Sequence, residues 1–196
     1  MYKKQLIVQK IICFAALAVS ALVFLYSLGL MTDLYDSLYY TMMDPTNPDD
    51  TWVSGSQIYY HMQPFNKQLL GYAIGMVLLS CLLFITSTHA RRRYYIGNAA
   101  AVGAFTVAGA ALSVWSHFQL QSFRAEFLQV DFDALQFFSE MMNTPYIKST
   151  FWFDAHYAVF GLVVLVCLLQ VVNYIWKLSL MRAEKRLIEE GKKVSA

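Results

Sequence analysis

Four stretches of this chain contain no charged residue over about twenty consecutive positions, and they lie at 11–31, 69–88, 96–115 and 157–176. The hydrocarbon layer of a bilayer is about 30 Å thick and an α-helix rises about 1.5 Å per residue, so a helix of each stretch is long enough to cross it. The sequence therefore predicts an all-α membrane protein, with residues 1–196 forming one four-transmembrane-helix bundle.

The basic residues sort to one side of this predicted topology. If both termini are cytoplasmic, 12 of the 15 Lys and Arg residues fall in the N-terminal segment, the inner loop 89–95 and the tail 177–196. Ten of the 13 acids then fall in the outer loops 32–68 and 116–156. Short basic segments stay in the cytoplasm during insertion, which predicts an N-in/C-in orientation. We expect the inner basic residues to meet anionic lipid headgroups, and we expect no nucleic-acid partner.

The outer loops lack the covalent features of a eukaryotic cell-surface protein. All three cysteines lie inside the charge-free stretches, and neither outer loop contains an N-x-S/T glycosylation sequence. Disulfides and glycans are common on extracellular domains. We therefore predict a multi-pass protein of a plasma membrane, in particular a bacterial cytoplasmic membrane. The first apolar run exceeds the length of a signal-peptide core, so we interpret it as an uncleaved anchor.

The two outer loops are long and rich in aromatic residues. In the second loop, Phe118, Phe123 and Phe127 recur at roughly helical spacing. Asp131 and Asp133 follow at positions typical of acidic residues in the first turn of another helix. The pattern predicts helices that extend beyond the bilayer and pack into a helical extracytoplasmic cap. The alternative is that these amphipathic pieces lie flat on the outer leaflet.

Small residues predict where the spans approach one another. The second span contains Gly71-x-x-x-Gly75, and the third carries Ala100, Ala104 and Ala108 at four-residue intervals. In lipid, helices associate by close backbone approach through such residues. We expect both stripes to pack within the monomer and the third span to be the most enclosed helix.

Three histidines lie at the outer ends of the predicted spans: His61, His117 and His156. Asp154 stands two residues before the last of them. If these helix ends meet, the three imidazoles could bind a metal such as zinc or copper, with Asp154 as the fourth ligand or as a hydrogen-bond partner of a ligand. No local metal-binding motif accompanies them, and histidine is also common at headgroup depth, so separate interfacial positions are the alternative.

The function must be argued mainly from what the chain lacks. No catalytic or nucleotide-binding motif is present, and no ionisable Asp, Glu, Lys, Arg or His lies in a charge-free stretch, which argues against a proton-driven pump. We predict a non-catalytic integral membrane subunit, an assembly, regulatory or auxiliary component of a larger complex such as a transporter. It would recognise a membrane-protein partner or form a homo-oligomer through its outer loops, without a cofactor. The alternative is an outer-surface metal or small-molecule binding protein or enzyme that uses His61, His117, His156 and Asp154.

Overall fold

The structure, a computed structural model, describes residues 2–34, 38–44, 46–47, 49–88 and 95–194. Within these ranges it contains helices and no named strand, in the order α1 (Tyr2–Gly29), the π-helical turn η1 (Leu30–Leu34), α3 (Ile58–Thr88), α4 (Tyr95–Phe127), α5 (Phe132–Met142) and α6 (Phe151–Val194). An isolated antiparallel bridge joins Met42 to Thr51 between η1 and α3.

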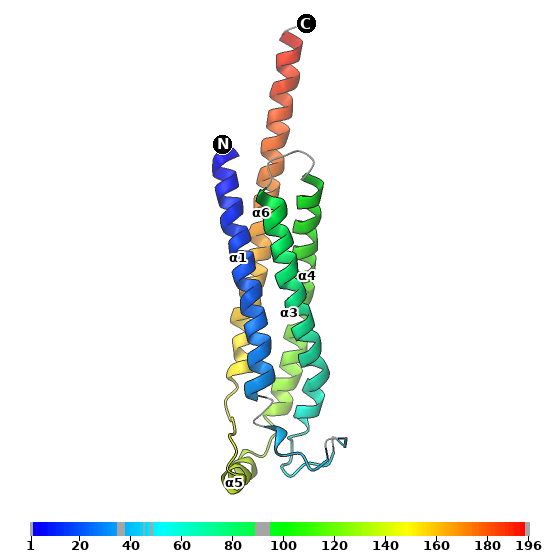
Figure 1. Ribbon diagram of the computed structural model, residues 1–196, viewed down its shortest axis with the longest axis vertical. Coiled ribbons are helices and arrows are strands. Elements are labelled where there is room, and N and C mark those ends of the chain that lie inside the picture. The colour runs from blue at the N-terminus through cyan, green and yellow to red at the C-terminus, as the bar shows by residue number, and fades with distance from the viewer. Residues whose placement is uncertain (1, 35–37, 45, 48, 89–94, 195–196) are drawn as a thin grey trace.

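The four long helices form a ring. Helix α1 packs on α3 and α6, and α4 packs on the same two helices. Consecutive long helices run in opposite directions, so both termini lie at one end of the bundle (Figure 1). All four are long and apolar enough to cross a membrane, which confirms the predicted all-helical class with four candidate spans in the described residues. The side on which the termini lie stays a prediction, and residues 89–94 of the predicted inner loop fall outside the described residues.

The helices are longer than the charge-free stretches. Helix α3 begins at Ile58 and α4 ends at Phe127, so both continue well beyond the predicted spans at the end of the bundle that lies away from the termini. Side chains in these extensions, such as Phe65 and Leu120, are buried. The core of the bundle therefore continues beyond the charge-free stretches. At the opposite end, the last turns of α6 project beyond the other helices (Figure 1).

The segments between the long helices fold together at one end of the bundle, and we call residues 38–57 and 128–150 the cap (Figure 1). Asp131 caps the N-terminus of α5 by accepting a 3.0 Å hydrogen bond from the backbone of Ala134. The backbone N–H of Asp131 donates to Ser54 O at 3.0 Å, and Val53 and Val130 are both buried. The predicted helix after Asp131 is therefore present, and the two loop segments pack on each other. Whether the cap is extracytoplasmic stays a prediction.

The predicted use of the small residues is wrong. A Cβ built on Gly71, Gly75 or Gly103 would meet no atom within 4 Å. Ala100 and Ala104 are exposed, and α4 is no more buried than α1 or α6.

The bundle instead turns the larger side chains of α4 inward, among them Phe105 and Leu112. Close helix approach occurs at Gly109, where a Cβ would lie 2.8 Å from Cys167 Sγ of α6. Small residues occur all around α4, so their spacing alone did not identify the inward face.

Candidate functional site

The polar residues at the cap end of α6 are organised by the start of that helix. Ser149 Oγ accepts a 3.1 Å hydrogen bond from the backbone N–H of Phe151, and Thr150 Oγ1 donates to Asp154 Oδ2 at 2.6 Å. Hydroxyl residues satisfy the free N–H groups of a first helical turn, and a carboxylate there is favoured by the helix dipole. This capping fixes where the first turns of α6 point.

Trp152 fastens that first turn to α1 and η1. Its carbonyl accepts a 2.7 Å hydrogen bond from the hydroxyl of Tyr26, and its indole N–H donates to Asp33 Oδ2 at 2.7 Å. The ring also lies over Gly29, where a Cβ would come within 2.0 Å of the indole. Only glycine fits at this position, so Gly29 allows the Trp152 ring of α6 to lie directly against α1.

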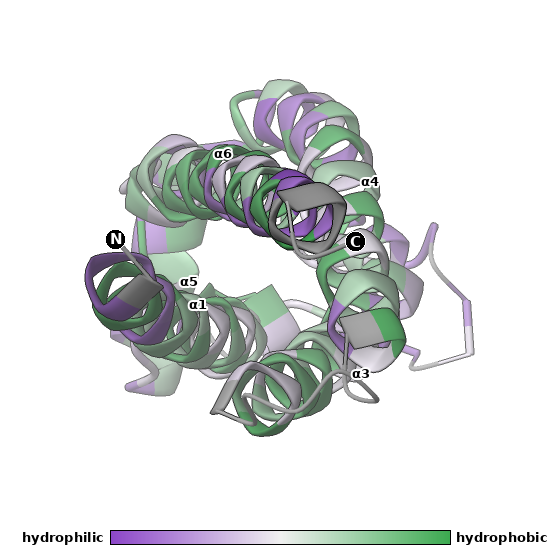
Figure 2. Cartoon of the chain, turned by 90° about the horizontal axis from the view of Figure 1, so that it is seen from above, coloured by the Kyte–Doolittle hydropathy of each residue, from purple (hydrophilic) through white to green (hydrophobic). Residues whose placement is uncertain are grey.

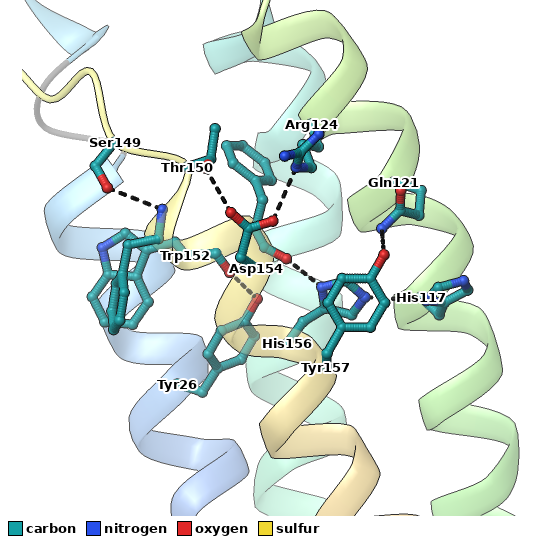
Figure 3. A network of polar contacts seen from close by, with 12 residues as sticks. Tyr26, His117, Gln121, Arg124, Ser149, Thr150, Trp152, Asp154, His156 and Tyr157 are labelled. Carbon is teal, nitrogen blue, oxygen red and sulfur yellow. Dashed lines mark hydrogen bonds and ion pairs between the residues drawn. The ribbon is translucent and has the colours of Figure 1, made fainter.

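His117 and His156 meet across the α4–α6 contact (Figure 3). The fully buried His156 places Nδ1 on the carbonyl oxygen of Phe153, and its Nε2 lies 3.1 Å from His117 Nδ1. A carbonyl can only accept, so His156 carries its proton on Nδ1 and its Nε2 accepts from His117. The Nε2 lone pair of His117 is then the one left available to a proton, a ligand or a metal.

The face of α4 that carries His117 also carries Gln121 and Arg124, because these residues are four and seven positions apart. Gln121 Nε2 donates to the hydroxyl of Tyr157 at 2.6 Å, and Arg124 Nε donates to Asp154 Oδ1 at 3.0 Å. The histidine pair thus lies in a polar contact between α4 and α6 that becomes ionic towards the cap (Figure 3).

His61 lies apart from this pair. Its Nδ1 contacts Glu126 Oε1, so it joins α3 to α4. Asp154 is bonded to Arg124 and Thr150. Of the four predicted ligands, the structure brings two imidazoles together. Among the residues that the structure describes, no three His, Cys, Asp or Glu side chains form a group that could hold a metal ion.

Two imidazoles are fewer than the three protein ligands of a catalytic zinc site or the four of a structural one. The described residues bring together two of the four predicted ligands, and the metal site stays a prediction.

The sequence analysis missed the residues that pair with the predicted ones. Glu126 bonds to His61, and Arg124 bonds to Asp154. Their spacing from His117 contained the signal for Arg124, since positions 117, 121 and 124 share a face. The partner of His61 depends on how α3 is rotated against α4, and no local pattern reports that rotation.

An apolar cleft of about 450 Å³ opens between α3 and α4. Its walls include Gly71, Gly75, Ala108 and Ala111, and Trp115 lies at the cap end of the α4 wall. The outward-facing glycines create this cleft because they leave the space that side chains would fill. Its wall contains no acidic, basic or histidine side chain, and Tyr72 contributes its one hydroxyl group.

No family model, curated protein or solved structure matches this chain.

Proposed function

We propose that this protein is a non-catalytic integral membrane subunit that recognises a partner membrane protein through its cap. The observation that supports this most directly is a folded cap with large exposed apolar side chains. Trp52 is 61% exposed and Phe137 is 69% exposed, although both belong to segments held by buried neighbours. The other exposed members are Tyr39, Tyr40, Met43, Leu128, Met141 and Met142.

Exposed apolar surface of this kind is costly in water and is typical of interaction sites. Tyr, Trp, Phe and Met are the residue types enriched at protein–protein interfaces. On α5, Phe137 and Met141 are four residues apart and therefore share one face, which suits the burial of that face against a partner.

The interior of the bundle supports a role without solute transport or catalysis. The four charge-free stretches contribute no carboxylate, amine, guanidinium or imidazole. Ion-coupled carriers and proton pumps use such groups inside the membrane. The ionic contacts at the cap end, such as Arg124–Asp154, already neutralise each other and need no substrate.

Co-purification tests this proposal. Wild-type protein is purified in a mild detergent from native expression, together with the double variant Trp52→Ser/Phe137→Ser and the control Gln136→Ser, which alters an exposed residue beside Phe137. We expect one defined membrane protein to accompany the wild type and the control in constant ratio and to be lost from the double variant. A set of co-purifying chains that is the same in all three samples would contradict the proposal.

The orientation is tested separately by thiol labelling. Single cysteines at Thr46 and Asn143 should react with an impermeant maleimide added to intact cells, and a cysteine at Glu190 should react only after the membrane is opened. The reverse pattern would place the cap in the cytoplasm and the partner on that side.

Metal binding is the second candidate function, with His117 Nε2 as the imidazole nitrogen of the pair that the described hydrogen bonds leave available to a metal. The contact of His156 Nδ1 with the carbonyl of Phe153 fixes the orientation of that ring, as backbone contacts do for many metal-ligating histidines. We expect metal analysis to find stoichiometric zinc or copper in wild-type protein and in His61→Ala, and none in His117→Ala. A metal content near zero in wild type, or one unchanged in His117→Ala, would refute this candidate.

A further inference from the structure

The end of the bundle nearest the termini buries an unusual number of polar side chains. All four long helices contribute, and each of these residues is at most 5% exposed: Gln5, Gln9, Ser87, Asn98, Gln170 and Asn173. Buried polar groups require hydrogen-bond partners, since an amide without one costs several kcal/mol in an apolar surrounding. The bonds that these residues make define a polar site at this end of the bundle.

One set of bonds runs through all four helices. Lys177 Nζ of α6 donates to Asn98 Oδ1 of α4 at 2.8 Å, and Asn98 Nδ2 donates to Ser87 Oγ of α3 at 3.0 Å. Cys13 Sγ of α1 donates to the same hydroxyl oxygen at 3.2 Å. The Lys177 ammonium is therefore directed across the bundle towards α4.

A second set lies one helical turn away. Gln5 Nε2 donates to Gln9 Oε1 at 2.9 Å and to Asn173 Oδ1 at 3.3 Å. Asn173 and Lys177 are four residues apart on α6, so they share a face. The Gln5 carbonyl oxygen is buried and has no hydrogen-bond partner. The unfilled acceptor thus belongs to a residue that contacts α6 one helical turn before the half-buried Lys177.

Among the described residues, the Lys177 ammonium has no carboxylate counter-ion. The segment 89–94 contains three arginines and no acid. The nearest acid along α6, Glu184, is seven residues further on, or about 10 Å along the helix. A half-buried cation without a counter-ion is unfavourable, and an external anion would relieve it.

The hydrogen-bond inventory points in the same direction. An ammonium has three N–H donors, and Lys177 uses one of them on Asn98. The oxygens of Asn98 and Ser87 already accept hydrogen bonds. The remaining N–H donors of Lys177 can therefore be directed to an incoming anion. The Gln5 oxygen requires the opposite, a donor. A ligand with an anionic oxygen and a nearby hydroxyl would satisfy both.

We propose that Lys177, Asn98 and Gln5 form a binding site for the phosphate-bearing headgroup of an anionic phospholipid. Lys177 directly follows the charge-free stretch 157–176, which places its ammonium at headgroup depth. The phosphate accepts from Lys177, and a headgroup hydroxyl, as in phosphatidylglycerol, donates to Gln5. Free phosphate offers the same anionic oxygens without an acyl chain. This proposal is independent of the role of the cap.

Thermal unfolding in detergent micelles tests the site. Full-length wild-type protein, Lys177→Gln and the control Arg182→Gln are each mixed with phosphatidylglycerol, phosphatidylcholine or inorganic phosphate. Arg182 is an exposed cation five residues further along the same helix. We expect wild type to bind phosphatidylglycerol at least tenfold more tightly than phosphatidylcholine. At lipid concentrations well above both dissociation constants, this preference corresponds to a Tm about 3–6 °C higher in phosphatidylglycerol. Arg182→Gln should keep the increase, and Lys177→Gln should lose it.

Each outcome decides between the possibilities. If phosphatidylglycerol raises the Tm of Lys177→Gln as much as that of the wild type, the proposed site is overturned. An increase with inorganic phosphate that depends on Lys177 supports the phosphate site and overturns the lipid as its source. If Lys177→Gln does not fold, native mass spectrometry of the wild type replaces it. The proposal is supported if each chain keeps one phosphatidylglycerol at a collision energy that removes phosphatidylcholine. It is refuted if both lipids are lost equally.

Discussion

Gly109→Ala should destabilise the bundle, whereas Gly103→Ala on the same helix should not. Both glycines lie in the interior of α4. A Cβ at Gly109 would lie 2.8 Å from Cys167 Sγ, 3.2 Å from Val163 Cγ1 and 3.3 Å from Met76 Cε, so α6 or its side chains must move. A Cβ at Gly103 would meet nothing within 4 Å.

The pair separates packing from helix propensity. Replacing an interior glycine by alanine favours a helix by about 0.8–1 kcal/mol, and this gain applies at both positions. Overpacking costs about 1–3 kcal/mol and applies at Gly109 alone. Gly109→Ala should therefore lie about 1–3 kcal/mol below Gly103→Ala in unfolding free energy, a difference of several degrees in Tm.

The assay is reversible unfolding in detergent, and a rescue variant identifies the cause. Cys167→Ala removes the nearest atom, so Gly109→Ala should cost less in the Cys167→Ala background than in wild type, with a coupling of at least about 0.5 kcal/mol. Equal stability of Gly109→Ala and Gly103→Ala would refute the assignment of Gly109 as a close α4–α6 contact. Additive effects of Gly109→Ala and Cys167→Ala would refute the sulfur contact as its cause.

Three further perturbations test the cap end. Tyr26→Phe removes the 2.7 Å bond to the Trp152 carbonyl and should lower the unfolding free energy by about 1 kcal/mol in the same unfolding assay. Hydrogen bonds from the backbone and hydroxyl of Thr46 lower the pKa of Asp44. These contacts therefore stabilise the turn fully above the ordinary aspartate pKa, and that stabilisation is lost as pH falls through the lowered value. An NMR titration of Thr46→Ala should show the Asp44 pKa rising towards its ordinary value. Asn143 ends α5 in the left-handed conformation (φ 51°), so Asn143→Ala should lose about 1 kcal/mol by thermal unfolding, and an unchanged Tm would contradict this role.

The sequence alone predicted the helical class and the number of spans. Four charge-free stretches of sufficient length predict four membrane-spanning helices, because in lipid each backbone polar group must be hydrogen-bonded within its own helix. Local signals were also sufficient for the helix after Asp131, since capping depends on residues within one turn.

The sequence did not determine how each helix is rotated about its axis. In a soluble protein the polar face marks the outside, but in lipid both the interior and the surface are apolar, and hydrophobic residues lie all around the four long helices (Figure 2). The glycines at 71 and 75 were therefore assigned to the wrong face. The same rotations bring His117 to His156, His61 to Glu126 and Lys177 to Asn98. These contacts join positions on different helices, so they depend on the tertiary packing of helices whose sequences carry no inward-facing signal.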